Sequence, residues 1–293
     1  MSDPGPRPSG LSGSQPAFID LHTHSTASDG SRAPADVARA AKAAGLAAFA
    51  LTDHDTIDGI APARAAAAEV GVRLVEGIEL SAMEEDGETH VLGLHLAETA
   101  ELSHRLIAVR EMRISRAERI VQRLNALGIP VSFDAVLRES AGGAVGRPHV
   151  ARALIAGGWV LDFREAFEKY LGNGKSAYVA KDKLALRDAI ALIHRAGGIA
   201  VLAHPGQGCA RERVVALVEL GLDGLEVLHP SHSWEEARRL DGIASELGLV
   251  RSGGSDWHGA PDGARSLGMM RVPAQWLADH DERVATRRSR RVA

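Results

Sequence analysis

Short apolar runs alternate with longer helical patterns along most of this chain. Seven runs have the length and flanking residues of buried strands, and they span 18–21, 46–52, 72–77, 89–96, 198–204, 221–228 and 247–254. Alanine-rich stretches with helical spacing lie between most of them, at 33–45, 58–71, 186–198 and 211–221, and each stops at a glycine. Strands separated by helices predict a parallel sheet, and seven strands sharing one polar edge predict an α/β barrel rather than an open sheet. The runs 72–77 and 89–96 have no helix between them, so the sheet is expected to deviate there.

The middle of the chain has a different pattern, with no convincing strand between about 101 and 180. Apolar residues recur there at helical spacing, and further helix-like stretches end at glycines. A helical insertion placed between two strands is a natural lid. The expected organisation is a disordered leader over 1–17, a barrel over 18–100 and 181–275, a helical insertion over 101–180, and a C-terminal helix with a basic tail over 276–293.

Composition narrows the class of protein. The 293 residues, 45% of them hydrophobic, suffice for one large domain or one domain with an inserted subdomain. A net charge of −4 gives no global basic signature, so bulk charge does not suggest nucleic acid. Cys209 is the only cysteine, which excludes an intramolecular disulfide and fits a reducing cytoplasm. No apolar run is long enough to span a membrane, so we expect a cytoplasmic protein without a membrane partner.

Ionisable residues collect where the predicted strands end. They are His22, His24, Asp29, Asp53, His54, Asp55, Glu79, His204, Glu226, His229, His232, Asp256 and His258. The carboxyl ends of parallel barrel strands open onto one face, so these side chains are expected to converge. His90 lies instead near the start of its run, where a strand of opposite direction would bring it to the same face.

The pair His22 and His24 predicts a metal site. Residues two apart on a strand point to the same side, and the following loop can return Asp29 toward a neighbouring ion. Burying so many imidazoles and carboxylates without an ion would be costly. Imidazole and carboxylate without thiolate suit Zn, Mn or Fe, and the ligand count exceeds one ion. We therefore expect two or three divalent ions with bridging carboxylates, and Mn as the ion that supports activity.

Six short motifs, "DLHTHS", "LTDHDT", "EGIELS", "HVLG", "LAHPG" and "GSDWHG", occur in this order from residue 18 to about 260. They resemble the ordered motifs of the PHP (polymerase and histidinol phosphatase) superfamily of phosphoesterases. The resemblance implies a distorted, TIM-like (β/α)7 barrel with three metal ions. It implies one ion held by His22, His24, Glu79 and Asp256, a second by Glu79, His90 and His204, and a third by Asp29, His54 and His258.

The insertion, with "GRPHVARAL" inside it, is similar to that of the subgroup containing 3′,5′-nucleoside bisphosphate phosphatase and enzymes that trim short RNA from the 5′ end. Pro148 marks a helix start, which favours anions beside Arg147 and His149. Arg147 is expected to grip a phosphate bidentately, the alternative being a surface arginine. His232 is a further expected substrate contact.

The resulting hypothesis is a metal-dependent phosphatase acting on a nucleotide, by attack of a hydroxide that bridges two ions. Glu79, His204 and Arg147 are the expected catalytic residues. The alternatives are a 5′-to-3′ exonuclease on short single strands, a histidinol-phosphate phosphatase, or a non-catalytic module. The expected partner is a small nucleotide or a short oligonucleotide, and the expected state is a monomer or a weak oligomer.

Overall fold

The strands form one mixed sheet. The computed structural model describes residues 17–84, 87–180, 184–260 and 265–292, so nearly all of the predicted leader lies outside the described residues. The strand order in space is β7-β6-β5-β4-β3-β2-β1-β8. The strands are β1 (Phe18–Asp20), β2 (Ala48–Leu51), β3 (Arg73–Glu84), β4 (Gly87–Leu94), β5 (Ile199–Leu202), β6 (Gly224–Leu228), β7 (Val250–Gly253) and β8 (Val272–Pro273).

The sheet curves into a barrel with one irregular segment. β1, β2 and β3 pair in parallel, as do β5, β6 and β7, whereas β4 is antiparallel to both β3 and β5. The N–H of Leu21 donates to the carbonyl of Gly253 at 3.0 Å, which brings the end of β1 against β7. The distorted (β/α)7 barrel and its expected deviation between the third and fourth strands are therefore confirmed. The two-residue strand β8, antiparallel to β1, was not predicted.

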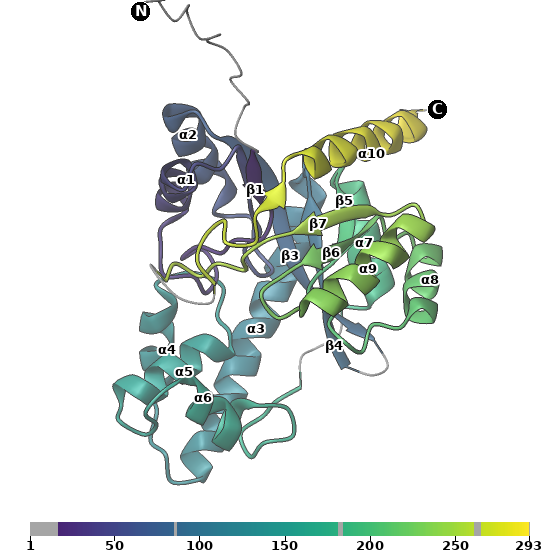
Figure 1. Ribbon diagram of the computed structural model, residues 1–293. Helices are drawn as coiled ribbons and strands as arrows, with labels where there is room; N and C mark the ends of the chain where they lie inside the picture. Colours follow the sequence, from purple (N-terminus) through teal and green to yellow (C-terminus); the bar gives the residue numbers. More distant parts are fainter. Residues whose placement is uncertain (1–16, 85–86, 181–183, 261–264, 293) are drawn as a thin grey trace, which may run out of the picture.

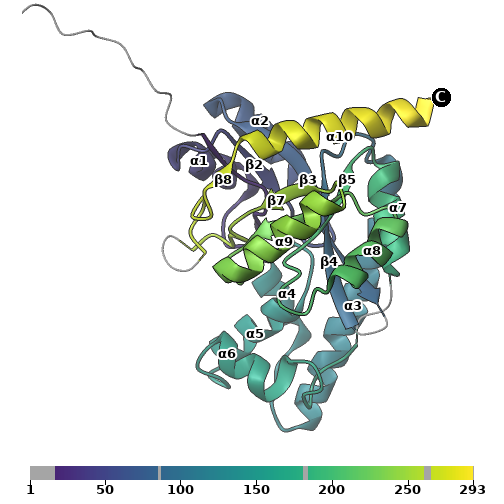
Figure 2. The same cartoon turned by 45° about the vertical axis from the view of Figure 1, so that its right-hand side comes forward.

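Helices cover the outside of the barrel and both of its ends. They are α1 (Pro34–Ala43), α2 (Ile60–Val70), α7 (Leu186–Arg195), α8 (Arg211–Glu219), α9 (Trp234–Glu246) and α10 (Gln275–Val292). The long α10, at the yellow end of the colour scale, crosses one end of the barrel, and the helices of the insertion lie at the opposite end (Figures 1 and 2). The alanine-rich α1 and α2 pack side by side against Phe49 and Leu51 of β2.

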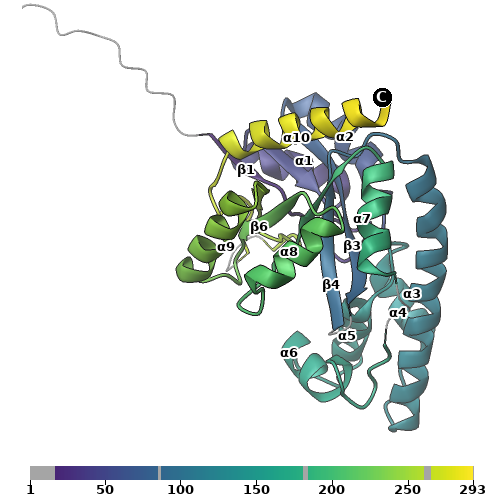
Figure 3. The ribbon, with the colours of Figure 1, turned by 90° about the vertical axis from the view of Figure 1, so that its right-hand side faces the viewer.

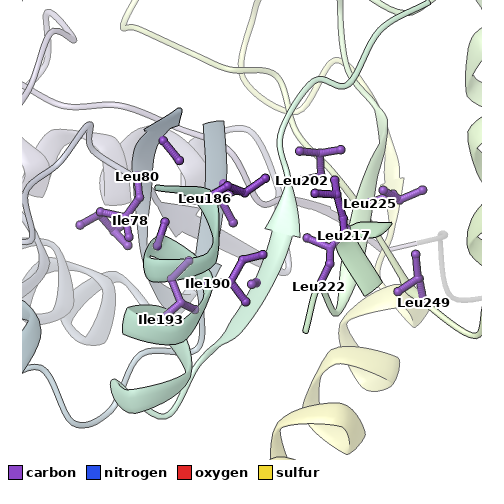
Figure 4. Packing of buried hydrophobic residues seen from close by; sticks show 14 of the residues in the cluster. Ile78, Leu80, Leu186, Ile190, Ile193, Leu202, Leu217, Leu222, Leu225 and Leu249 are labelled. Atoms are coloured by element: carbon purple, nitrogen blue, oxygen red, sulfur yellow. The ribbon is translucent and has the colours of Figure 1, made fainter. Parts of the chain in front are cut away.

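Apolar strand residues hold the helices to the sheet. Ile78 and Leu80 of β3 pack in the same buried cluster as Ile190 and Ile193 of α7, and the cluster continues to Leu225 of β6 (Figure 4). Fully burying one such side chain contributes about 1.5–3 kcal/mol. This packing fixes the strands whose ends carry the polar residues.

The segment between β4 and α7 is helical in the part of the chain that the structure describes. It contains α3 (Ala100–Ala126), α4 (Phe133–Ser140), α5 (Arg147–Ala156), α6 (Phe163–Ala166) and a π-helix, η1 (Phe167–Leu171). These helices have an apolar core of their own, centred on Leu124, Val150 and Leu154. Figure 3 shows α3 running alongside α7 on the barrel and continuing down to α5. The insertion is thus joined to the barrel by one long helix.

Candidate metal centre and active-site cavity

The barrel mouth brings the predicted metal ligands together. Three groups of predicted ligands have ligand atoms within 4.8 Å of one another: His24, Asp29, His54 and His258; His22, His24 and Asp256; and His54, Glu79 and His90. The antiparallel β4 carries His90 to this face, as its position near the start of the run required. A fourth group contains His22, Glu226 and His229.

Glu79 lies at the centre of these groups and is buried. Its two oxygens contact five imidazoles: 2.7 Å to His90 Nδ1, 3.1 Å to His204 Nε2, 3.1 Å to His54 Nδ1, 3.2 Å to His22 Nε2 and 3.3 Å to His24 Nε2. Burial opposes ionisation of Glu79, but the surrounding imidazoles hold its pKa well below the usual range. An ionised carboxylate with both oxygens facing ligand imidazoles is placed to bridge two cations.

Two aspartates, Asp29 and Asp256, extend the group, and Asp29 also lines the cavity next to the insertion. Asp256 Oδ1 lies 3.1 Å from His24 Nε2, and Asp29 Oδ1 lies 3.3 Å from His258 Nε2. Burial works against the ionised form of Asp256, yet the neighbouring His22 holds its pKa well below the usual range. Burial lowers the pKa of His54 to about 3, which leaves a neutral imidazole with a free lone pair. Burial opposes the charged form of His24, but Asp256 and Glu79 raise its pKa to about 10, so this ring would release a proton on binding a cation. Carboxylates and imidazoles together form a donor set for divalent metals.

Unpartnered ring nitrogens support the same assignment. Among the described residues, neither ring nitrogen of His24 nor Nδ1 of His54 has a hydrogen bond of good geometry, although carboxylate oxygens lie 3.1 Å from His24 Nε2 and from His54 Nδ1. A buried polar atom without a partner costs about 1–3 kcal/mol. Coordination to a divalent cation removes that cost, so the residues present fit the expected ions.

Glu226 is a residue of the centre that the sequence did not place among the ligands. It is fully buried, and its Oε1 accepts a hydrogen bond from His22 Nδ1 at 2.9 Å. Its Oε2 accepts from the backbone N–H of His204 at 2.6 Å. A carboxylate on one ring nitrogen fixes the tautomer and directs the other nitrogen at the metal. The signal was present, because Glu226 was among the ionisable residues at the predicted strand ends, on a strand that opens onto the same face as the predicted ligands.

A cavity of about 230 Å³ separates the metal centre from the insertion. Asp29, His54 and His90 line it on the barrel side, and the insertion side is lined by Arg113, Arg116, Arg147 and Phe167. A second cavity of about 340 Å³ shares Glu88, His90 and Arg147 with the first. It continues past His204 to Asn173 and Arg213.

Arg147 lies where the two cavities meet. It begins α5, just before Pro148, and its Nη1 donates to the carbonyl of Leu171 at 3.3 Å and to Asn173 Oδ1 at 3.1 Å. Its guanidinium carbon is 5.7 Å from the ring centroids of both Phe167 and Tyr178. Its side chain is 20% exposed and lines both cavities, and its contact with phosphate stays a prediction.

Arg113 and Arg116 reach the cavity from α3 and were not predicted. Arg113 Nε donates to the buried carboxylate of Asp55 at 2.8 Å. Arg116 Nε donates to the carbonyl of Val179 at 2.8 Å, whereas its Nη2 is buried without a hydrogen-bond partner. Burial, and then the charge of Arg147, lower the pKa of Arg116. An anion entering the cavity would supply the missing partner.

His149 and His232 have backbone partners in the structure. His149 is buried, and its Nδ1 accepts from the N–H of Gly146 to cap α5. The ring of His232 accepts from the N–H of Gly206 at 3.2 Å and donates to the carbonyl of Val227 at 3.0 Å. Neither residue is among those that line the two cavities. Their geometry supports a structural role, and the predicted substrate contacts rest on the sequence alone.

The family model of the PHP domain matches residues 20–204, more than half of the chain. The chain belongs to the PHP family. This PHP protein is 39% identical over 260 residues to the 3′,5′-nucleoside bisphosphate phosphatase of Chromobacterium violaceum, covering 86% of this chain and 91% of the relative. It is 39% identical over 245 residues to the 5′-3′ exoribonuclease of Haemophilus influenzae, covering 82% of this chain and 89% of the relative.

A solved structure agrees with the sequence relatives. A protein of Bifidobacterium adolescentis, assigned as a metal-dependent phosphoesterase, superimposes with a TM-score of 0.83 at 32% identity and covers 92% of this chain and 98% of its own. The PHP protein is therefore an enzyme, a metal-dependent phosphoesterase, as the motifs indicated. No helix among its described residues is long and apolar enough to cross a membrane.

Proposed function

We propose that this enzyme hydrolyses a phosphomonoester of a nucleotide, with the scissile phosphate at the metal centre and a second anionic group in the arginine-lined cavity. The observation that carries the proposal is Arg116 Nη2, which is buried, has no hydrogen-bond partner among the described residues, and belongs to a cavity that Arg113 and Arg147 also line. A charged donor without a partner is expensive to bury unless a ligand completes it.

The metal centre is proposed to hold two or three divalent ions, with Mn supporting activity. The ligands follow the grouping given by the motifs, with Glu79 shared between two ions. When bound, such ions neutralise phosphoryl oxygens and make water a stronger nucleophile. Glu226 orients His22 by its hydrogen bond to Nδ1 and positions the backbone of His204.

The arginines give the site its preference for a doubly anionic substrate. Guanidinium groups hold phosphate bidentately, and Arg147 is kept in place by Asn173 and by the carbonyl of Leu171. A 3′,5′-bisphosphate would use the metal centre for one phosphate and the arginines for the other. An AMP-like monophosphate would use only one of the two. The named activity of the relative from C. violaceum supports this assignment.

A second candidate function is 5′-to-3′ exonuclease activity on short single strands. The second cavity favours it, because about 340 Å³ of space adjoins His204 and leads to Arg213 and Asn173. A strand that continues beyond the scissile phosphate would have room there, and one relative is named an exoribonuclease. A cytoplasmic location and a monomeric or weakly associated state complete the proposal and rest on the sequence.

The test is a substrate panel with Mn: AMP, a 3′,5′-nucleoside bisphosphate, histidinol phosphate and short oligonucleotides. We expect the highest kcat/KM for the bisphosphate. Arg116→Met should lower that value about 10- to 100-fold, the cost of one charge-assisted contact, and should affect AMP much less. Arg105→Met, exposed on the same helix, is the matched control. The absence of phosphate release from every nucleotide, with Mn bound, would refute the proposal.

A further inference from the structure

The loop that carries Asp29 is held from the barrel side by a buried carboxylate. Asp53 Oδ1 accepts from the N–H of Ser25 at 2.7 Å and from Ser28 Oγ at 2.6 Å, and Asp53 Oδ2 accepts from Ser25 Oγ at 2.7 Å. These bonds fix residues 25–28 to the end of β2. They do not reach the backbone of Asp29 itself.

The insertion holds the same loop from the other side. The N–H of Ala144 donates to the carbonyl of Ala27 at 2.9 Å, and Arg152 Nη2 donates to the carbonyl of Asp29 at 2.6 Å. The backbones approach so closely that a Cβ at Gly143 would lie 2.5 Å from the carbonyl oxygen of Thr26. The loop is therefore enclosed between the barrel and the insertion.

Two of these residues contact the predicted metal ligand Asp29 directly: Ser28 Oγ lies 3.4 Å from its Oδ1, and Arg152 binds its backbone carbonyl. The hydrogen bond from Arg152 fixes the carbonyl of Asp29, and the orientation of that peptide sets where the carboxylate points. The carboxylate faces His258 Nε2 at 3.3 Å and belongs to the group of His24, Asp29, His54 and His258. The exposed ring of Phe163 lies 6.0 Å from the guanidinium carbon of Arg152, at the outer limit of a cation–π contact.

We propose that Arg152 is a positioning residue for the ion held by this group, so that the insertion builds part of the metal centre. The inference rests on the metal centre of the proposed function but not on the identity of the substrate. Partners that orient a ligand from behind change metal affinity about 10- to 100-fold when removed. The ion assigned to Glu79, His90 and His204 has no ligand in this loop. The ion assigned to His22, His24, Glu79 and Asp256 has a ligand directly before the loop but none within residues 25–29.

The experiment measures Mn binding to the full-length protein by calorimetry and by metal analysis after dialysis. In Arg152→Met we expect one Mn per chain to bind about 10- to 100-fold more weakly, while the remaining Mn binds as in the parent. Activity at limiting Mn should fall and should return at saturating Mn, with KM unchanged. Arg152→Lys keeps a donor and should restore part of the affinity.

Two further variants keep the test decisive. Phe163→Leu removes the ring beside Arg152 without touching Asp29 and should bind Mn as the parent does. Gly143→Ala forces the loop away from Ala144 by a backbone clash and should weaken the same Mn, so it tests the idea even if Arg152→Met folds poorly. Parent-like Mn binding in Arg152→Met, or in Gly143→Ala if the former does not fold, would overturn the proposal.

The two proposals fail in different ways. If the parent protein binds Mn but releases no phosphate from nucleotides, the proposed substrate is wrong and the role of Arg152 stands. If the parent acts on nucleotides and Arg152→Met keeps every Mn at parental affinity, the role of Arg152 is wrong and the proposed function stands.

Discussion

The barrel mouth and the insertion contribute opposite charges to one cavity. The barrel supplies buried carboxylates, and the insertion supplies guanidinium groups from α3 and α5. Asp29 lines this cavity, and Glu79, Glu226 and Asp256 are buried in the barrel mouth. The arginines that line the cavity are Arg113, Arg116 and Arg147. The barrel therefore attracts cations and the insertion attracts anions. The proposed substrate, a phosphate ester held by metal ions and by these arginines, would match both surfaces at once.

The two regions also hold their functional side chains differently. Strand ends fix the barrel ligands, because the sheet hydrogen bonds set their backbone. The arginines come from helices and are each anchored to a carbonyl oxygen, at Val145 for Arg113, Val179 for Arg116, Leu171 for Arg147 and Asp29 for Arg152. The position of each arginine therefore depends on loop backbone elsewhere in the fold. We expect substitutions of the barrel ligands to abolish catalysis and substitutions of the insertion arginines to lower kcat/KM only in part.

The largest expected effect is at the centre of the barrel ligands. Glu79→Gln removes the charge that two ions are proposed to share, and metal ions supply several kcal/mol of transition-state stabilisation. We expect kcat to fall by roughly a thousand-fold or more and the bound Mn per chain to decrease. Metal analysis and phosphate release measure the two effects. Full activity with one Mn or none per chain would refute the cluster.

The second-largest effect is expected at the buried ion pair between Arg113 of the insertion and Asp55 of the barrel. Arg113→Met leaves the carboxylate of Asp55 buried without its cation, which destabilises proteins by about 3–5 kcal/mol. Chemical denaturation measures the loss. The control is Arg110→Met, on the same helix as Arg113. It breaks an exposed ion pair with Asp58 and should lower the free energy of unfolding by less than about 1 kcal/mol. Equal losses in the two variants would show that the buried pair does not join the regions.

Substitution of Arg147 has the smallest expected effect, and it tests which phosphate of the substrate this residue holds. Arg147→Lys keeps the charge but loses the planar contact with phosphate, so kcat/KM should fall about 10- to 100-fold. The loss should be larger for a bisphosphate than for a monophosphate if Arg147 holds the phosphate that is not cleaved. Equal losses would place it at the reacting phosphate instead. Activity within two-fold of the parent on every nucleotide would remove it from the site.

The contrast between the regions also explains what the sequence could predict. The strands and the residues at their ends were readable, because a short apolar run followed by histidine or aspartate is a local pattern. His90 even predicted the direction of β4. Arg113 and Arg116 were missed although they continue the buried stripe of α3, because their partners Asp55 and Val179 lie far away in the chain. No local pattern reports such a distant partner.

Other differences have the same origin. His149 and His232 looked available for substrate, yet nearby backbone groups occupy their ring nitrogens. Glu226 was seen at a strand end, but its role depends on His22 and on the N–H of His204. The residue types and their positions in the motifs predicted that these side chains converge at the barrel mouth. The role of each of these residues could be assigned only from the hydrogen bonds in the structure.

The barrel closes where the end of β1 lies against β7, and this seam has a consequence for folding. It joins segments far apart in the chain, as when the N–H of Ser255 donates to Asp20 across 235 residues of sequence. Closing so long a loop carries a large entropic cost and slows folding. His22 and His24 stand on one side of the seam and Asp256 and His258 on the other, so an ion that needs both sides can bind only after closure. If an ion is held by residues from both sides, as proposed above, its uptake during refolding would report closure of β1 against β7.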